Sequence, residues 1–281
     1  MPPELAVAAF GLLSALSWGT GDFSGGIASR HSSSLAVVLW SQPIGGAIAL
    51  VLAVAWGEHG LTASDLVWSV LAGLCGPTAL VFFYRGLAVG RMGVVAPIAG
   101  VLGAGIPVVV GGLFQGVPAP AQLAGIGLAL VSVLLVTRVG DQASGGHRGV
   151  PEALVAGLGF GAFFVLLGQV GQGVVFLPFV ILRIVACVVM VAVVVLGRRP
   201  WRLARPSLVP VAIAGVLDLG GNLWYLLAAQ NGRLDIAAVL SSLYPVVTMV
   251  LAAALLRERI GRLQAAGILA ALGAVILIAA G

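Results

Sequence analysis

The stretch RVGDQASGGHRGVP, residues 138–151, is the longest polar interval in the chain. Apolar sequence dominates on both sides of it, since 60% of the 281 residues are hydrophobic and only 8% are charged. Soluble domains carry about 25% charged residues, and no soluble core could hide so much apolar sequence. Lipid leaves no partner for free backbone groups, so long apolar runs must form helices. The sequence therefore predicts an all-α integral membrane protein.

Apolar runs separated by short polar breaks predict ten transmembrane helices of about 20 residues each. Five precede the polar interval and five follow it. The predicted spans are Leu5–Ala28, Leu35–Trp56, Leu66–Leu87, Val94–Phe114, Gln122–Val139, Glu152–Gly168, Val174–Leu196, Leu208–Gln230, Ile236–Leu256 and Leu263–Ala280.

The two sides of the polar interval repeat one another when the first is shifted by 142 positions. The matches in this ungapped register include Gly73 with Gly215, Gly90 with Gly232, Arg91 with Arg233, Gln122 with Gln264 and Gly125 with Gly267. We therefore predict a five-helix repeat at 1–137, a polar linker at 138–151 and a second five-helix repeat at 152–281. Because five is odd, the second repeat must sit inverted. Inverted repeats are typical of secondary transporters, which bind substrate where the repeats meet.

The arginines predict how the chain is oriented in the membrane. With ten spans both termini lie on one side, and the opposite loops hold eleven of the fourteen basic residues. These are Arg30, Arg91, Arg138, Arg148, Arg198, Arg199, Arg202, Arg205, Arg257, Arg259 and Arg262. The positive-inside rule places this side in the cytoplasm and both termini outside. One miscounted span would exchange the sides for half of the chain.

The composition also argues against several classes of protein. The net charge of +5 comes from arginines at the edges of apolar runs, which does not suggest a nucleic-acid partner. Cys75 and Cys187 lie inside apolar runs, without the spacing of metal ligands. We find no HExxH, GxSxG or Walker motif, and His31, His59 and His147 lie in loops. The sequence predicts no enzyme activity, no metal site and no cofactor.

The end of the chain, SLYPVVTMVLAAALLRERIGRLQAAGILAALGAVILIA, resembles the EamA family of the drug/metabolite transporter superfamily. The resemblance rests on Pro245, the Arg257-Glu258-Arg259 cluster, Gln264 and Gly267. YRGLAVGRMGVVAPI and WGTGDF in the first half are similar to the corresponding parts of the family pattern. The resemblance implies two EamA units and a role in export of amino acids, metabolites or drugs. The first half departs from it, with Gln115-Gly116-Val117 in place of the charged cluster. The resemblance also implies cytoplasmic termini, against the arginine count.

Asp22 is a carboxylate within the first predicted span. Ionisable groups inside a membrane are costly and usually face a bundle interior or a wet cavity. Asp22 is therefore a candidate for proton exchange during transport. The alternative is that it lies near the end of its span and binds backbone amides among the neighbouring glycines.

Asp218, Asn222 and Tyr225 follow one another at spacings of four and three, which places them on one helical face. Such a stripe can hold a polar substrate and accept a proton, or simply form hydrogen bonds between helices. Arg183 lies inside FVILRIVACVV and needs a partner, which Asp218 or Asp22 could supply. Alternatively, Arg183 could bind a substrate carboxylate.

Weaker candidates complete the predicted binding site. Arg85 beside Tyr84 could bind substrate, or it could extend to the membrane surface. Gln42 lies next to a proline and could line the cavity. Ser241, Ser242 and Tyr244 add polar groups beside the kink that Pro245 predicts.

Together these features predict a secondary active transporter, expected to be an exporter, for a small polar or amphipathic metabolite such as an amino acid or a drug-like compound. Its predicted partners are that substrate, protons and the lipid bilayer, and its oligomeric state is not predicted. The alternatives are an uncoupled facilitator and a membrane scaffold that transports nothing. A chain this apolar is expected in the plasma membrane, and the resemblance implies a bacterial inner membrane.

Overall fold

The computed structural model describes residues 3–90, 92–137, 149–256 and 261–280, and within these ranges the regular structure is entirely helical. The helices are α1 (Pro3–Ala28), α2 (Ser34–Trp56), α3 (Ala63–Val89), α4 (Met92–Phe114), α5 (Pro120–Thr137), α6 (Val150–Leu167), α7 (Leu177–Leu196), the short η2 (Arg205–Ser207), α8 (Leu208–Asn231), α9 (Leu234–Ser241), α10 (Tyr244–Leu256) and α11 (Arg262–Ala280).

Within the described residues, six helical segments are long and apolar enough to cross a membrane. These are Ser34–Trp56, Ala63–Val89, Val150–Leu167, Leu177–Leu196, Arg205–Asn231 and Leu234–Leu255. Two shorter apolar helices cover Ile98–Phe114 and Pro120–Ser132. The chain is thus a helical protein with several candidate membrane spans, and the count of ten stays a prediction.

The ninth predicted span, Ile236–Leu256, corresponds to the candidate span Leu234–Leu255, but it is not one continuous helix. It is divided into α9 and α10, with Ser242 and Leu243 in a turn between them. Pro245 lacks the amide that a helix interior uses, and it lies in the first turn of α10, where no such amide is needed. The Ser242 hydroxyl donates to the Val239 carbonyl at 2.7 Å and so satisfies part of the end of α9.

The predicted linker at 138–151 is mostly outside the described residues, as are Arg91 and the Arg257-Glu258-Arg259 cluster. Its last two residues, Val150 and Pro151, belong to α6. Gly149 precedes them with a φ of 84°, a conformation that favours glycine. Helix α6 therefore starts earlier than the predicted boundary at Glu152.

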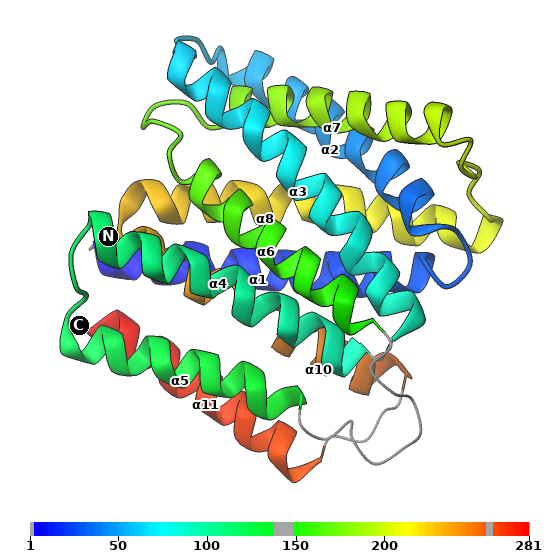
Figure 1. Ribbon diagram of the computed structural model, residues 1–281. Helices are drawn as coiled ribbons and strands as arrows, with labels where there is room; N and C mark the ends of the chain where they lie inside the picture. The colour runs from blue at the N-terminus through cyan, green and yellow to red at the C-terminus, as the bar shows by residue number, and fades with distance from the viewer. Residues whose placement is uncertain (1–2, 91, 138–148, 257–260, 281) are drawn as a thin grey trace.

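Each helix from α1 to α5 makes its most extensive contacts with a helix from the second half of the chain. Helix α1 packs on α8, α2 on α7, α3 and α4 on α6, and α5 on α11. Figure 1 shows α2 beside α7 at one edge of the bundle and α5 beside α11 at the opposite edge. The two halves are thus interleaved, and their contact surface runs through the whole protein.

Two glycines bring helices of opposite halves into close contact. A Cβ added to Gly73 of α3 would lie 2.8 Å from the Leu182 carbonyl oxygen of α7. A Cβ added to Gly215 of α8 would lie 2.6 Å from the Ser41 carbonyl oxygen of α2. Any side chain would separate these helices. Gly73 and Gly215 are also partners in the sequence repeat, so equivalent residues make equivalent contacts with the other half.

Both chain ends lie on the same side of the bundle, at the left in Figure 1. The loops at the opposite end connect α1 to α2 and α7 to α8, and they are joined by Ser32, whose hydroxyl donates to Ser207 Oγ at 2.8 Å. Five exposed arginines lie in these two loops: Arg30, Arg198, Arg199, Arg202 and Arg205. The charge asymmetry behind the predicted orientation is therefore a feature of the folded bundle.

Candidate functional site

A cavity lies within the bundle, between helices of both halves. Helices α1, α2, α3, α6, α7, α8 and α10 all contribute to its wall. The lining residues are Trp18, Asp22, Gln42, Gly76, Pro77, Leu80, Phe160, Phe163, Phe164, Leu182, Arg183, Asp218, Asn222 and Tyr244. Six of the eleven residues predicted for the binding site are among them: Asp22, Gln42, Arg183, Asp218, Asn222 and Tyr244.

Arg183 is the centre of the polar part of the cavity wall. Its side chain is only 2% exposed, although it comes from the middle of α7. Nη1 donates to Asp218 Oδ2 at 2.6 Å and also to Gln42 Oε1. Of the two carboxylates that the sequence offered as partners, Asp218 and Asp22, the structure pairs Arg183 with Asp218 and adds Gln42. The three side chains come from α7, α8 and α2, so the cluster connects the two halves.

Asp22 lies on the cavity wall, six residues before the end of a continuous α1. The neighbouring backbone amides therefore take part in the helix, which disfavours the alternative that Asp22 binds them. Its carboxylate instead forms a hydrogen bond with the hydroxyl of Tyr84 from α3. Tyr84 itself does not line the cavity. Its ring lies over Gly25, where an added Cβ would overlap Tyr84 Cζ. Tyr84 thus holds the Asp22 carboxylate in position without itself lining the cavity.

Tyr225 is turned away from the cavity. Asp218 and Asn222 line the cavity wall, but the Tyr225 hydroxyl donates to the Phe164 carbonyl at 2.8 Å. Its ring packs against Phe164 and Trp18, with centroid distances of 4.9 and 5.9 Å. The three-residue stripe predicted on α8 therefore has two members in the cavity and one in the contact between α6 and α8.

Three other predicted candidates also lie outside the cavity lining. Arg85 has a side chain that is 63% exposed and pairs with Glu152 of α6 at 3.3 Å. Ser241 and Ser242 are buried at the break between α9 and α10. There Ser242 bonds the Val239 carbonyl at the turn that precedes Tyr244.

The aromatic part of the wall was not predicted from the sequence. Trp18, Phe160, Phe163 and Phe164 form one side of the cavity, and the Trp18 and Phe164 rings stack at 5.3 Å. The spacing of the three phenylalanines, at i, i+3 and i+4, places them on one face of α6. That pattern is a signal that sequence reasoning could have used.

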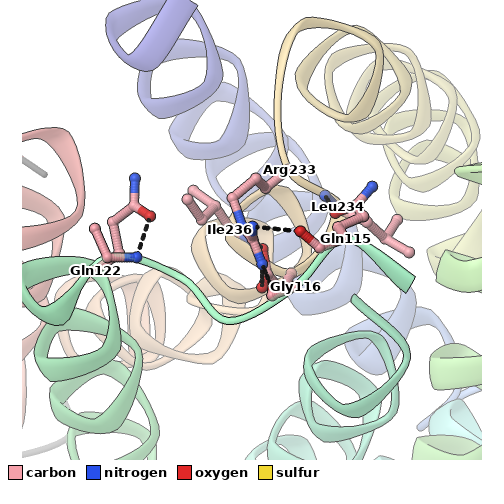
Figure 2. A network of polar contacts seen from close by, with 8 residues as sticks. Gln115, Gly116, Gln122, Arg233, Leu234 and Ile236 are labelled. Carbon is pink, nitrogen blue, oxygen red and sulfur yellow. Dashed lines mark hydrogen bonds and ion pairs between the residues drawn. The ribbon is translucent and has the colours of Figure 1, made fainter. Parts of the chain in front are cut away.

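A second buried Arg–Asp pair lies at the end of the bundle that holds the termini. Arg233 Nε and Nη2 donate to the two carboxylate oxygens of Asp235 at 3.1 and 2.9 Å. Arg233 also donates to the carbonyls of Gln115 and Gly116, in the loop between α4 and α5. Figure 2 shows this network, in which the Gln115 side chain also accepts the amide of Leu234 at 3.0 Å. The pair therefore connects the two halves away from the cavity.

No candidate metal site is found among the described residues. Over residues 3–90, 92–137, 149–256 and 261–280, no three His, Cys, Asp or Glu side chains come together as a group that could hold a metal ion.

Comparison with known proteins finds a family match over the second half of the chain. Residues 147–280 match the EamA-like transporter family. This family belongs to the drug/metabolite transporter superfamily, as the sequence motifs predicted. Solved structures are also similar to it. One, titled "Crystal structure of protein", has a TM-score of 0.75 and 16% identity and covers 96% of this chain and 97% of its own. At that identity the likeness shows the fold alone. None of the curated proteins matches the chain.

The matched segment contains only part of the cavity wall. It supplies Arg183, Asp218 and the aromatic residues of α6. Asp22 and Gln42 come from helices that precede the match. The polar cluster is therefore completed by the half of the chain that the family match leaves out.

Proposed function

We propose that the whole chain is a member of the EamA family and works as a secondary active transporter, an exporter of a small polar or amphipathic metabolite. The observation that carries the proposal is the cavity with the Arg183–Asp218 pair, enclosed by helices of both halves of the chain. Ionisable groups inside a membrane protein typically mark a substrate or ion pathway. The family supports the same conclusion, since EamA members are transporters rather than enzymes.

The inverted repeat is part of this proposal. In such transporters the site lies where the repeats meet, and one set of helices moves against the other around it. The equivalent contacts of Gly73 and Gly215 support a two-fold relation between the halves. We propose that ten helices span the plasma membrane with the arginine-rich end in the cytoplasm.

Asp22 and Asp218 are the proposed proton carriers. Both line the cavity, and each already has a partner that can change during the cycle: Tyr84 for Asp22 and Arg183 for Asp218. A carboxylate that loses its partner when substrate arrives can take up a proton. Coupling of substrate movement to protons would follow from this linkage.

Transport in proteoliposomes tests the proposal. Vesicles would be loaded with a pool of amino acids and other metabolites, with and without an imposed pH gradient. We would compare the native protein with Asp22→Asn, Asp218→Asn and the exposed loop control Arg30→Gln. We expect the gradient to drive movement of a compound in the native protein and the control, and one Asp variant to lose that drive while it stays folded.

The other outcomes identify the alternatives. Equal transport without a gradient, unchanged in both Asp variants, would indicate an uncoupled facilitator. No transport of any compound by the folded native protein would favour the membrane scaffold.

A further inference from the structure

The cavity wall contains buried polar atoms that lack a hydrogen-bond partner within the described parts of the chain. On the residues that line the cavity these atoms are Gln42 Nε2, Arg183 Nε, Arg183 Nη2 and Tyr244 Oη. Each belongs to a side chain that is at most 4% exposed. Buried polar groups in proteins are nearly always paired. Such a concentration in one cavity suggests that a ligand supplies the missing partners.

The unpartnered atoms are donors. A guanidinium group can only donate, and a phenol hydroxyl can donate. The orientation of the Gln42 amide follows from its neighbour. Because Arg183 Nη1 only donates, the Gln42 oxygen must face it, which leaves the amide nitrogen as the free group. The ligand must therefore offer acceptor atoms near Arg183 and Gln42.

The acidic groups of the cavity already have partners. Asp218 accepts from Arg183, and Asp22 is hydrogen-bonded to Tyr84. A cationic ligand would have to compete with these contacts while the free donors of Arg183 stayed unpaired. An anionic ligand would pair with those donors directly. The arrangement of partners thus favours an acceptor of negative charge.

The rest of the wall suits an apolar body. Trp18, Leu80, Phe160, Phe163 and Phe164 lie around the polar cluster, and small-molecule sites are typically lined by such apolar and aromatic side chains with a few polar groups. A ligand that satisfies both parts has a charged acceptor group at one end and an aromatic or aliphatic group at the other.

We infer that the substrate is an amphipathic carboxylate, with its carboxylate bound by Arg183 and the Gln42 amide and its apolar body against the Phe160–Phe164 side of the cavity. This inference rests on the proposed function, because it names the class of compound that the transporter moves. Arg183 is the residue that determines specificity. The substrate carboxylate competes with Asp218 for the guanidinium, so substrate binding loosens the Arg183–Asp218 pair.

Binding of three related probes tests this inference on the purified full-length chain in nanodiscs. The probes are 3-phenylpropionate, its neutral amide 3-phenylpropionamide, and the cation 2-phenylethylamine. Equilibrium binding would be measured by calorimetry. We expect the carboxylate to bind at least about ten-fold more tightly than the amide, as for loss of a charge-assisted hydrogen bond. We expect the amine to bind more weakly still.

Variants of Arg183 separate a specific site from general apolar binding. Arg183→Gln should bring the affinity for carboxylate down to that for the amide, and Arg183→Lys should restore part of the difference. The matched control Arg30→Gln, which changes an exposed loop arginine, should keep the full preference. If Arg183→Gln does not fold, Gln42→Met removes the free amide and should weaken only carboxylate binding, by several-fold.

Two results would overturn the inference: tighter binding of the amine than of the carboxylate, or an unchanged preference for carboxylate in folded Arg183→Gln. The proposed function fails separately. If proteoliposomes move compounds but none with a carboxylate, the transporter stands and the carboxylate site falls. If carboxylates bind as expected but nothing is transported, the site stands and the transporter falls.

Discussion

The protein contains two buried Arg–Asp pairs that differ in how well they are satisfied. Arg233 is 25% exposed, yet all three guanidinium nitrogens donate, to Asp235 and to the Gln115 and Gly116 carbonyls. Arg183 is 2% exposed, yet its Nε and Nη2 lack partners within the described residues. The more deeply buried arginine therefore has fewer hydrogen bonds.

This difference in hydrogen bonding indicates that the two Arg–Asp pairs have different roles. A buried ion pair that supports the fold needs its remaining donors satisfied, because desolvation is costly. Arg233 meets that requirement and connects α9 to the loop after α4. Arg183 does not, and it lies on the wall of the cavity. We conclude that the first pair stabilises the fold and the second is kept available for a ligand.

Arg233→Met should have the largest effect on stability. It would leave Asp235, which is 0% exposed, without its counter-ion. Removal of one partner from a buried pair costs about 3–5 kcal/mol. We expect a fall of this size in the free energy of unfolding, measured by denaturant titration in detergent, with transport by the folded fraction unchanged.

The double variant Arg233→Met with Asp235→Leu is the control, because it removes both charges. It should recover most of the lost stability. If the double variant were as unstable as the single one, the loss would come from packing and not from the unpaired carboxylate.

Arg183→Gln should have the opposite effects to Arg233→Met, with a small change in stability and a large loss of transport. Asp218 has a side chain that is 17% exposed and lies on the cavity wall, so it can hydrate when its partner is lost. We expect a stability change of about 1 kcal/mol or less and at least a ten-fold loss of transport, since hydrogen bonds to charged groups contribute about 1.5–3 kcal/mol. Unfolding data and transport rates would be measured on the same preparations. A loss of stability as large as that of Arg233→Met would remove the distinction between the two pairs.

Gly25→Ala should test whether Tyr84 acts on Asp22 in the cavity. The new methyl would overlap Tyr84 Cζ and would displace the ring. Overpacking of this kind costs about 1–3 kcal/mol, and Asp22 would lose its hydrogen bond. We expect a moderate fall in stability together with weaker drive by the pH gradient.

Gly105→Ala is the matched control for that substitution, since its Cβ would meet no atom within 4 Å. It should stay within about 0.5 kcal/mol of the native protein. Unchanged gradient-driven transport in Gly25→Ala would show that Tyr84 has no role in coupling.

Glu58→Gln should have the smallest effect. The Glu58 carboxylate accepts the amides of Val175, Phe176 and Leu177 at the start of α7. The neutral amide can still accept hydrogen bonds but loses the charge that favours a helix N-terminus, which contributes about 0.3–1 kcal/mol. The melting temperature should fall slightly and transport should not change. Reduced transport with normal stability would assign this end of the bundle a direct role.

The sequence predicts a partner for Arg183 in the cavity, but it does not predict the buried Arg233–Asp235 pair. An arginine inside an apolar run must find a carboxylate, so the position of Arg183 predicts a partner such as Asp218. Arg233 and Asp235 lie in a predicted loop, where charges are normally solvated. Their burial depends on Gly111 of α4, since a Cβ there would lie 3.0 Å from Asp235 Cβ. Such a contact between distant segments leaves no local pattern.

Side-chain packing also explains why helical spacing did not predict which residues of α8 line the cavity. The positions of Asp218, Asn222 and Tyr225 follow the predicted face, but the Tyr225 ring is larger and turns into the contact between α6 and α8. The apolar runs located the helices well, with an error at Ser242 and Leu243, where Pro245 begins a new helix. The cavity wall depends on seven helices, which no single stretch of sequence encodes.

The interleaved pairing of the helices has a consequence for how the protein is made. Helices α1 to α5 find their main partners among helices that the ribosome makes later. Until α6, α7, α8 and α11 enter the membrane, the surface around Gly73, which packs on α7, has no counterpart except lipid. The first half alone should therefore be an unstable insertion intermediate. The two halves expressed as separate polypeptides should accumulate only when both are present in the same cell.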